Sequence, residues 1–220
     1  SASRTGGHVT NPPGGRCMMT LIWDVDDVLN NLMGQWFETV WQPTHRDANL
    51  RYSDLSVNPP HEILGVPLTD YLESLDTFRR EHYAVQEPLP EVREWFQAHG
   101  TSCRHVALSA VPVSCASFTA EWVFRHFGVW VQTFAIVPSP RDAVSDTARP
   151  KTKAEYLQWL GHGDVLVEDN DQNLQAAAEL GLRGVAIPRP WNQARHQSLR
   201  AALIQLTDLV HGGGRPFSTV

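Results

Sequence analysis

Cysteine is scarce in this chain: the three residues present, Cys17, Cys103 and Cys115, lie at unrelated spacings. An odd number without a repeated spacing fits neither a disulfide framework nor a zinc site. Folds rich in disulfides belong to oxidising compartments. The cysteine usage therefore predicts a protein of a reducing compartment, and we expect a cytoplasmic location.

Long hydrophobic runs and an excess of positive charge are also missing. No apolar stretch reaches the roughly 20 residues that span a bilayer, which argues against a membrane protein. The net charge of −6 argues against a general surface for nucleic-acid polymers, although a local basic pocket is compatible with it. We expect a small-molecule partner, and the choice between a monomer and a homodimer stays open.

The first part of the chain, residues 1–17, is rich in Gly, Pro, Ser and Thr and lacks the apolar segment of a signal peptide. We expect a flexible tail there, with Met18 or Met19 as the native start. The total length of 220 residues fits one domain, or a core with a small inserted cap.

The most informative stretch is an apolar run from Met18 to Trp23 that ends in Asp24 and Asp26. A buried parallel strand has this pattern when its carboxyl end brings polar groups to a site. Side-chain alternation places the two aspartates on the same side of the chain. Because carboxylates so close repel each other, we expect a positive group between them, most simply Mg²⁺. An acidic turn at a strand end is the alternative interpretation.

After Asn30 the pattern becomes helical until Pro43, then irregular, and then helical again from Tyr71 to His82, with Thr69 or Asp70 available as N-cap. Residues 31–86 are therefore predicted to form a helical cap insert, and residues 18–30 and 87–220 the core domain. The aromatic residues of the insert fit either an ordinary core or the lining of a substrate pocket.

From Pro88 onward, short apolar runs alternate with helical patterns. The runs predicted as strands are 105–108, 133–137, 164–167 and 184–187. This alternation predicts a parallel, three-layer Rossmann-like α/β sheet with right-handed crossovers, and ligands bind such sheets at the carboxyl ends of the strands.

Three further polar signals stand at the ends of these elements. Ser109 closes the second apolar run, and Glu168-Asp169 closes the fourth. Between them, Thr152 and Glu155 have the spacing of a capping box, so a helix is expected to begin near Lys153. Each signal alone is compatible with an ordinary turn, a helix cap or a solvated surface lysine.

In this order, the four segments resemble the motifs of the haloacid dehalogenase (HAD) superfamily, whose members are mostly Mg²⁺-dependent phosphatases. The resemblance implies that Asp24 is the nucleophile, that Asp26 is the general acid and base, and that Ser109 binds a phosphoryl oxygen. The active-site lysine is then Lys153 or Lys151, and the position of the predicted helix start favours Lys153.

The same resemblance implies a Mg²⁺ site formed by Asp24, the backbone carbonyl of Asp26 and Asp169. Glu168 would act on the metal through water, and Asn170 and Asn173 would hold the loop. Asp27 stands where most members of the superfamily have Gly.

For the substrate, the Asp-x-Asp-x-Val-Leu start, the aromatic cap and Arg189-Pro190-Trp191-Asn192 resemble the 5′(3′)-deoxyribonucleotidase branch. A nucleoside monophosphate or similar small phosphomonoester is therefore expected, hydrolysed through an aspartyl-phosphate. The candidates for substrate contacts are Asn30, Asn31, Trp36, Arg51 and Ala110. The alternatives are a phosphotransferase or mutase of the same superfamily and a non-catalytic module that binds a phosphorylated ligand or a protein.

Overall fold

A computed structural model describes residues 18–139 and 150–212, so the expected tail lies outside the described residues. Its centre is a five-stranded sheet with strand order β3-β2-β1-β4-β5, and every strand pair is parallel. The strands are β1 (Thr20–Trp23), β2 (Arg104–Ser109), β3 (Val131–Ile136), β4 (Val165–Glu168) and β5 (Arg183–Ala186). This confirms the predicted parallel α/β fold.

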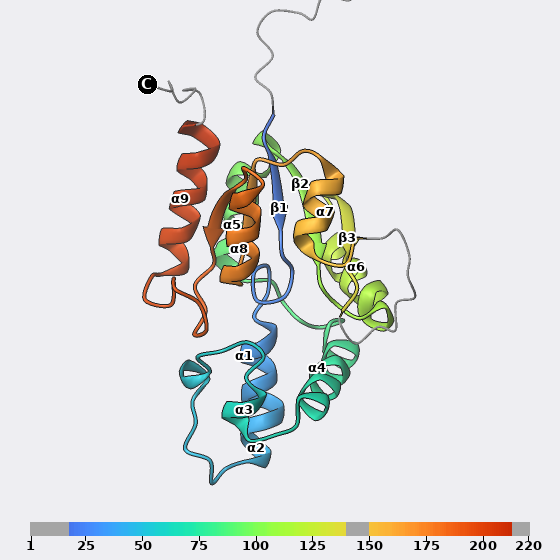
Figure 1. Cartoon of the computed structure of the whole chain (residues 1–220), viewed down its shortest axis with the longest axis vertical. Helices are drawn as coiled ribbons and strands as arrows, with labels where there is room; N and C mark the ends of the chain where they lie inside the picture. The colour runs from blue at the N-terminus through green and yellow to red at the C-terminus, as the bar shows by residue number, and fades with distance from the viewer. Residues whose placement is uncertain (1–17, 140–149, 213–220) are drawn as a thin grey trace, which may run out of the picture.

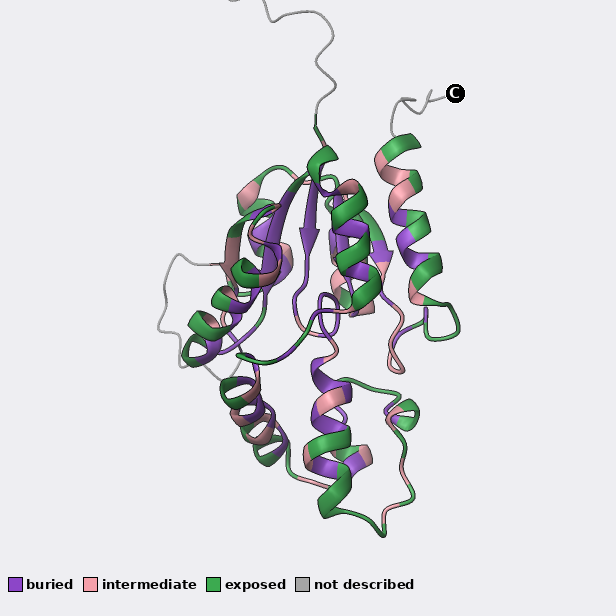
Figure 2. Cartoon of the chain, turned by 180° about the vertical axis from the view of Figure 1, so that it is seen from behind, coloured by how far each residue is buried: buried purple, intermediate pink, exposed green. Residues whose placement is uncertain are grey.

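Helices cover both faces of the sheet (Figure 1). On one face, Leu21 and Trp23 of β1 pack against α5 (Pro90–His99), α6 (Val113–Phe127) and α9 (Leu199–Gly212). On the other face, Ile22 packs against α7 (Lys153–Leu160) and α8 (Asp171–Glu179). The alternation of β1 side chains thus contributes to both cores. The central strands β1, β2 and β4 are almost entirely buried, the edge strands β3 and β5 are partly exposed, and the outer helix surfaces are exposed (Figure 2).

The cap segment, residues 31–86, lies beyond the carboxyl end of β1 (Figure 1). It contains α1 (Leu32–Trp36), a π-helical segment (Phe37–Trp41), α2 (Gln42–Thr44), a 3₁₀ turn (Tyr52–Asp54), α3 (His61–Leu64) and α4 (Leu68–His82). It has its own apolar core, to which Trp36, Phe37, Trp41, Tyr71 and Phe78 contribute. Most of its aromatic residues therefore belong to this core, which is the first of the two interpretations given above.

Two sequence predictions for the cap segment are wrong in detail. Pro43 lies inside the helical path rather than beyond its end: α1, the π-helical segment and α2 follow one another without a break, and the path ends at Thr44, one residue after Pro43. The second long helix begins at Leu68, before both expected caps, with Pro67 as N-cap and no capping side-chain hydrogen bond. In the described part of the chain, no helix combines the length and the apolar character needed to cross a membrane.

Candidate active site

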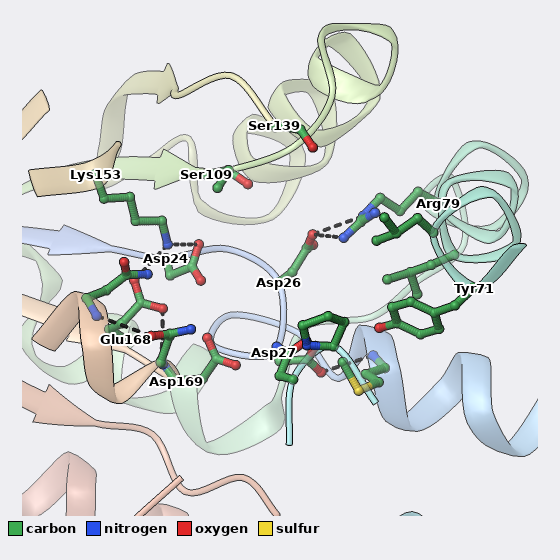
Figure 3. A pocket seen from close by; sticks show the side chains of 18 of the residues that line it. Asp24, Asp26, Asp27, Tyr71, Arg79, Ser109, Ser139, Lys153, Glu168 and Asp169 are labelled. Carbon is green, nitrogen blue, oxygen red and sulfur yellow. Dashed lines mark hydrogen bonds and ion pairs between the residues drawn. The ribbon is translucent and has the colours of Figure 1, made fainter. Parts of the chain in front are cut away.

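A cavity of about 570 Å³ opens where the carboxyl ends of the strands face the cap segment. The sheet and its loops contribute polar lining residues, and α4 contributes a row of mostly apolar ones (Figure 3). The residues that line it are Asp24, Asp26, Asp27, Met33, Asn58, Pro59, Leu68, Tyr71, Leu72, Leu75, Arg79, Ser109, Ala110, Ser139, Lys153, Glu168, Asp169, Asn170 and Asn173.

Lys153 is the central cation on the sheet side of the cavity. It is the first residue of α7, and its Nζ lies 2.7 Å from Asp24 Oδ1 and 2.7 Å from Glu168 Oε2. The helix begins there because the Thr152 hydroxyl accepts the Glu155 N–H at 3.1 Å. Only this half of the expected capping box forms, because the Glu155 carboxylate accepts the N–H of Lys151 instead. The Lys151 side chain is exposed.

Burial dominates the electrostatics of this cluster. It raises the pKa of Asp24 to about 8, with the Glu168 charge adding to the effect, and it also raises the pKa of Glu168. Burial alone would lower the pKa of Lys153, but the adjacent Asp24 and Glu168 carboxylates raise it above its ordinary value. Lys153 is therefore charged at neutral pH, and the acids around it exceed it in number.

Asp26 has different partners from Asp24, contrary to the expectation of a single cation between them. Strand β1 ends at Trp23, and the Asp26 side chain turns toward α4 (Figure 3). There Arg79 donates to Asp26 Oδ2 from Nε at 3.0 Å, and the Tyr83 hydroxyl donates to Oδ1. Arg79 also pairs with Asp76 at 2.5 Å. The two aspartates thus each have their own cation.

Sequence reasoning missed Arg79, although its position carried a signal. Arg79 follows Leu75 by four residues and lies on the buried face of α4 with Tyr71. Only 7% of its surface is exposed, and buried arginines need charged partners. Burial alone would lower the pKa of Arg79, but Asp26, Tyr83 and Asp76 raise it.

Asp169 is held by the loop that follows β5. Trp191 Nε1 donates to Asp169 Oδ2 at 2.8 Å, and the Asn192 side chain donates to the Asp169 carbonyl at 2.9 Å. Burial and the charges of Asp24 and Asp27 raise the pKa of Asp169 to about 7. The Trp191 ring also packs against Tyr52 of the cap segment, so the loop contacts both sides of the site.

Asp27 adopts a positive φ of 61° at the turn after Asp26. This conformation favours Gly, and Asp is one of the residues that tolerate it. The carboxylate compensates by accepting the N–H of Met33 at 3.0 Å, while Arg189 donates to the Asp27 carbonyl at 2.6 Å. Burial raises the pKa of Asp27 to about 7.

The other expected site residues divide into two groups. Ser109, Ala110, Asn170 and Asn173 line the cavity, and Asn170 is also the N-cap of α8, accepting the Gln172 and Asn173 N–H groups. The residues that do not line it are Asn30, Asn31, Trp36 and Arg51.

Packing and chain geometry explain the second group. Asn30 is buried and braces the turn by accepting the N–H of Asp27 at 3.0 Å. The Asn31 side chain lies against Gly34 of α1. Trp36 belongs to the cap core and donates to the Ser74 hydroxyl at 3.0 Å. Arg51 is exposed at the start of the 3₁₀ turn.

The chemistry of the donor set fits a divalent cation. Carboxylate oxygens of Asp24, Glu168 and Asp169 lie within 4.8 Å of one another, and all three residues are buried. Buried carboxylates without sufficient positive charge are costly, which the raised pKa values of Asp24 and Asp169 reflect. Hard oxygen ligands of this kind suit Mg²⁺.

Solved structures with a similar fold include hydrolases of the haloacid dehalogenase superfamily. A haloacid dehalogenase-like hydrolase from Streptococcus pneumoniae has a TM-score of 0.55 at 12% identity, over 86% of this chain and 97% of that chain. A Thermotoga maritima protein assigned as a beta-phosphoglucomutase has a TM-score of 0.55 at 19% identity, over 87% of this chain and 100% of that chain.

A HAD family hydrolase from Deinococcus radiodurans, with bound phosphate and sodium, has a TM-score of 0.54 at 16% identity, over 90% of this chain and 96% of that chain. No model of a protein family matches the sequence, and no curated protein does. At such low identity these likenesses show the fold, so the resemblance to the HAD superfamily is confirmed at that level.

Proposed function

We propose that this chain is a Mg²⁺-dependent phosphatase that hydrolyses a small phosphomonoester, with nucleoside monophosphates as candidate substrates, through an aspartyl-phosphate intermediate. The observation that carries the proposal is the buried Asp24–Lys153–Glu168 cluster beside Asp169, which lines a cavity large enough for a small ester. A nucleophile, a cation and a metal-binding acid in contact are what phosphoryl transfer requires.

The first step uses the orientation of the Asp24 carboxylate. Its Oδ1 accepts the Val25 N–H at 2.8 Å and pairs with Lys153, which fixes the plane of the group. In our proposal Oδ2 attacks phosphorus, and the bond from phosphorus to the leaving oxygen breaks as the new bond forms. Lys153 and the Ser109 hydroxyl stabilise charge on the phosphoryl oxygens.

Asp26 supplies the proton for the leaving oxygen and then removes a proton from the water that hydrolyses the aspartyl-phosphate. Both of its oxygens accept hydrogen bonds from Arg79 and Tyr83 in this structure. Proton donation therefore requires Asp26 to exchange these partners for the substrate. A Mg²⁺ held by Asp24, Asp169 and the Asp26 carbonyl would supply further neutralisation of the phosphoryl charge.

Phosphate release from a panel of esters, including thymidine 5′-monophosphate and glucose 6-phosphate, tests the proposal. We expect Mg²⁺-dependent release that EDTA abolishes and that the Asp24→Asn variant lacks. This variant removes one charge from a crowded acidic cluster, so it should fold normally. Substantial turnover by purified Asp24→Asn protein would show that Asp24 is not the nucleophile.

Transfer of the phosphoryl group to an acceptor other than water is the second candidate, because the Thermotoga maritima neighbour is assigned as a beta-phosphoglucomutase. It requires the same residues for the first half of the reaction. Release of inorganic phosphate in stoichiometric amounts supports hydrolysis, whereas isomerised ester without free phosphate supports a mutase.

A further inference from the structure

The cavity has two chemically different sides. The sheet side presents the acids and Lys153, and Tyr71 of α4 lies on the opposite side (Figure 3). The apolar and aromatic residues of α4 that line the cavity are Leu68, Tyr71, Leu72 and Leu75. These α4 positions are three, four and seven residues from the first, so they lie on one face of the helix. Met33 of α1 and Pro59 add to the same apolar lining.

The α4 side is unfavourable for a second anionic group. Among the described residues that line the cavity, Arg79 and Lys153 are the cations, and Lys153 belongs to the sheet side. Arg79 is shared by Asp26 and Asp76, so one positive charge faces two negative ones. An anion on this side would compete with Asp26 and Asp76 for the single charge of Arg79, which is unfavourable.

The α4 side is equally unfavourable for a leaving group with many hydroxyls. Leu68, Leu72, Leu75, Met33 and Pro59 offer no side-chain hydrogen bonds, and within this row of α4 the hydrogen-bonding group is the Tyr71 hydroxyl. A hydroxyl that loses water without finding a partner weakens binding by roughly tenfold or more. An apolar leaving group binds more tightly in the same environment, because each methylene group that it buries increases the affinity about fourfold.

We propose that the leaving group of the substrate is uncharged and places an apolar ring or chain against α4. The proposal rests on the phosphatase function of the site and specifies its substrate class. It includes esters with a flat ring face, such as nucleosides, and excludes bisphosphates and hexose phosphates. About 570 Å³ accommodates a phosphoryl group together with one such ring system.

Three esters that differ in the leaving group test this specificity: 2-phenylethyl phosphate, glucose 6-phosphate and 2-phosphoglycolate. All three contain a phosphorylated primary hydroxyl group, so intrinsic reactivity differs little between them. We expect kcat/KM for 2-phenylethyl phosphate to exceed that for each of the others by at least about tenfold. Equal or reversed values would overturn the proposal.

Acetyl phosphate separates this outcome from a failure of the proposed function. Its leaving group is too small to fill the α4 side, so it reports the phosphoryl chemistry alone. Hydrolysis of acetyl phosphate without any preference among the three esters refutes the apolar leaving group and leaves the phosphatase standing. Absence of Mg²⁺-dependent turnover with all four compounds refutes the phosphatase.

A pair of variants locates the preference on α4. Leu72 is half-buried and lines the cavity, so Leu72→Gln should fold while raising KM for 2-phenylethyl phosphate about three- to tenfold. The effect on acetyl phosphate, whose leaving group does not fill the α4 side, should be smaller than the effect on 2-phenylethyl phosphate. Ile204→Gln makes a similar change on the exposed surface of α9, outside the cavity, and should alter neither substrate. Identical kinetics of the two variants with 2-phenylethyl phosphate would refute the assignment to α4.

Discussion

Replacement of Lys153 by Met tests the central cluster, because Met keeps the length of the side chain and removes its charge. Lys153 is 4% exposed, and its Nζ lies 2.7 Å from both Asp24 Oδ1 and Glu168 Oε2. The variant therefore leaves two buried carboxylates without their cation. Breaking a buried ion pair in this way costs about 3–5 kcal/mol of unfolding free energy.

Proton uptake limits this loss. Burial already raises the pKa of Asp24 to about 8, and removal of the Lys153 charge raises it further. The carboxyl groups then become neutral rather than remaining charged and unpaired. We therefore expect the lower end of the range, about 3 kcal/mol, measured by urea denaturation in EDTA at pH 7.

The catalytic loss should be similar in size to the stability loss. A cation beside the nucleophile and the phosphoryl group contributes about 2–4 kcal/mol to transition-state stabilisation, so kcat/KM should fall by about two to three orders of magnitude. The assay is phosphate release at a temperature well below the midpoint of thermal unfolding, where the variant is folded.

Lys151→Met is the matched control, because Lys151 is exposed and two residues away. We expect near wild-type stability and activity for it. If Lys153→Met retained kcat/KM within threefold of wild type, the role of the cluster in phosphoryl transfer would be refuted. A stability loss below about 1 kcal/mol would contradict the reasoning on buried charge.

Asp26→Asn should reduce turnover most for esters with poor leaving groups, because an activated phenolate needs little protonation; equal losses across leaving groups of different pKa would argue against the general acid. Asp169→Ala should raise the Mg²⁺ concentration for half-maximal activity and reduce the thermal stabilisation by Mg²⁺, so an unchanged Mg²⁺ response would exclude Asp169 as a ligand. Burial lowers the pKa of His105 from 6.5, so its contribution to stability is present above pH 6.5 and is lost as the pH falls through the lowered value. Between these two pH values the free energy of unfolding changes by at most about 1.4 kcal/mol per pH unit, and His105→Gln should lack this change. Identical pH profiles of urea unfolding for both proteins would contradict this assignment.

The sequence alone determined the sheet and the meeting of its polar ends. Asp24, Ser109 and Asp169 each follow a short apolar run, and the strands of a parallel sheet all point their carboxyl ends to one edge. Local chemistry was sufficient for Lys153 too, since the Thr152 cap defines the helix start that turns it inward. The chemical roles of these residues stay predictions, but their proximity follows from the pattern of apolar runs and from the parallel arrangement of the strands.

Only the tertiary structure shows which side chains the cap segment brings to the site. That Arg79 and Tyr83 donate to Asp26, and that Trp191 donates to Asp169, depends on how distant elements pack, and no local period encodes such contacts. Trp36 was misplaced for the same reason: a helical stripe shows that one face is buried, not whether it faces a core or a cavity. Arg51 lies in an irregular stretch, where no helical or strand period indicates the direction of a side chain. The apolar side that α4 presents to the cavity became visible only once the cap segment was placed over the strand ends.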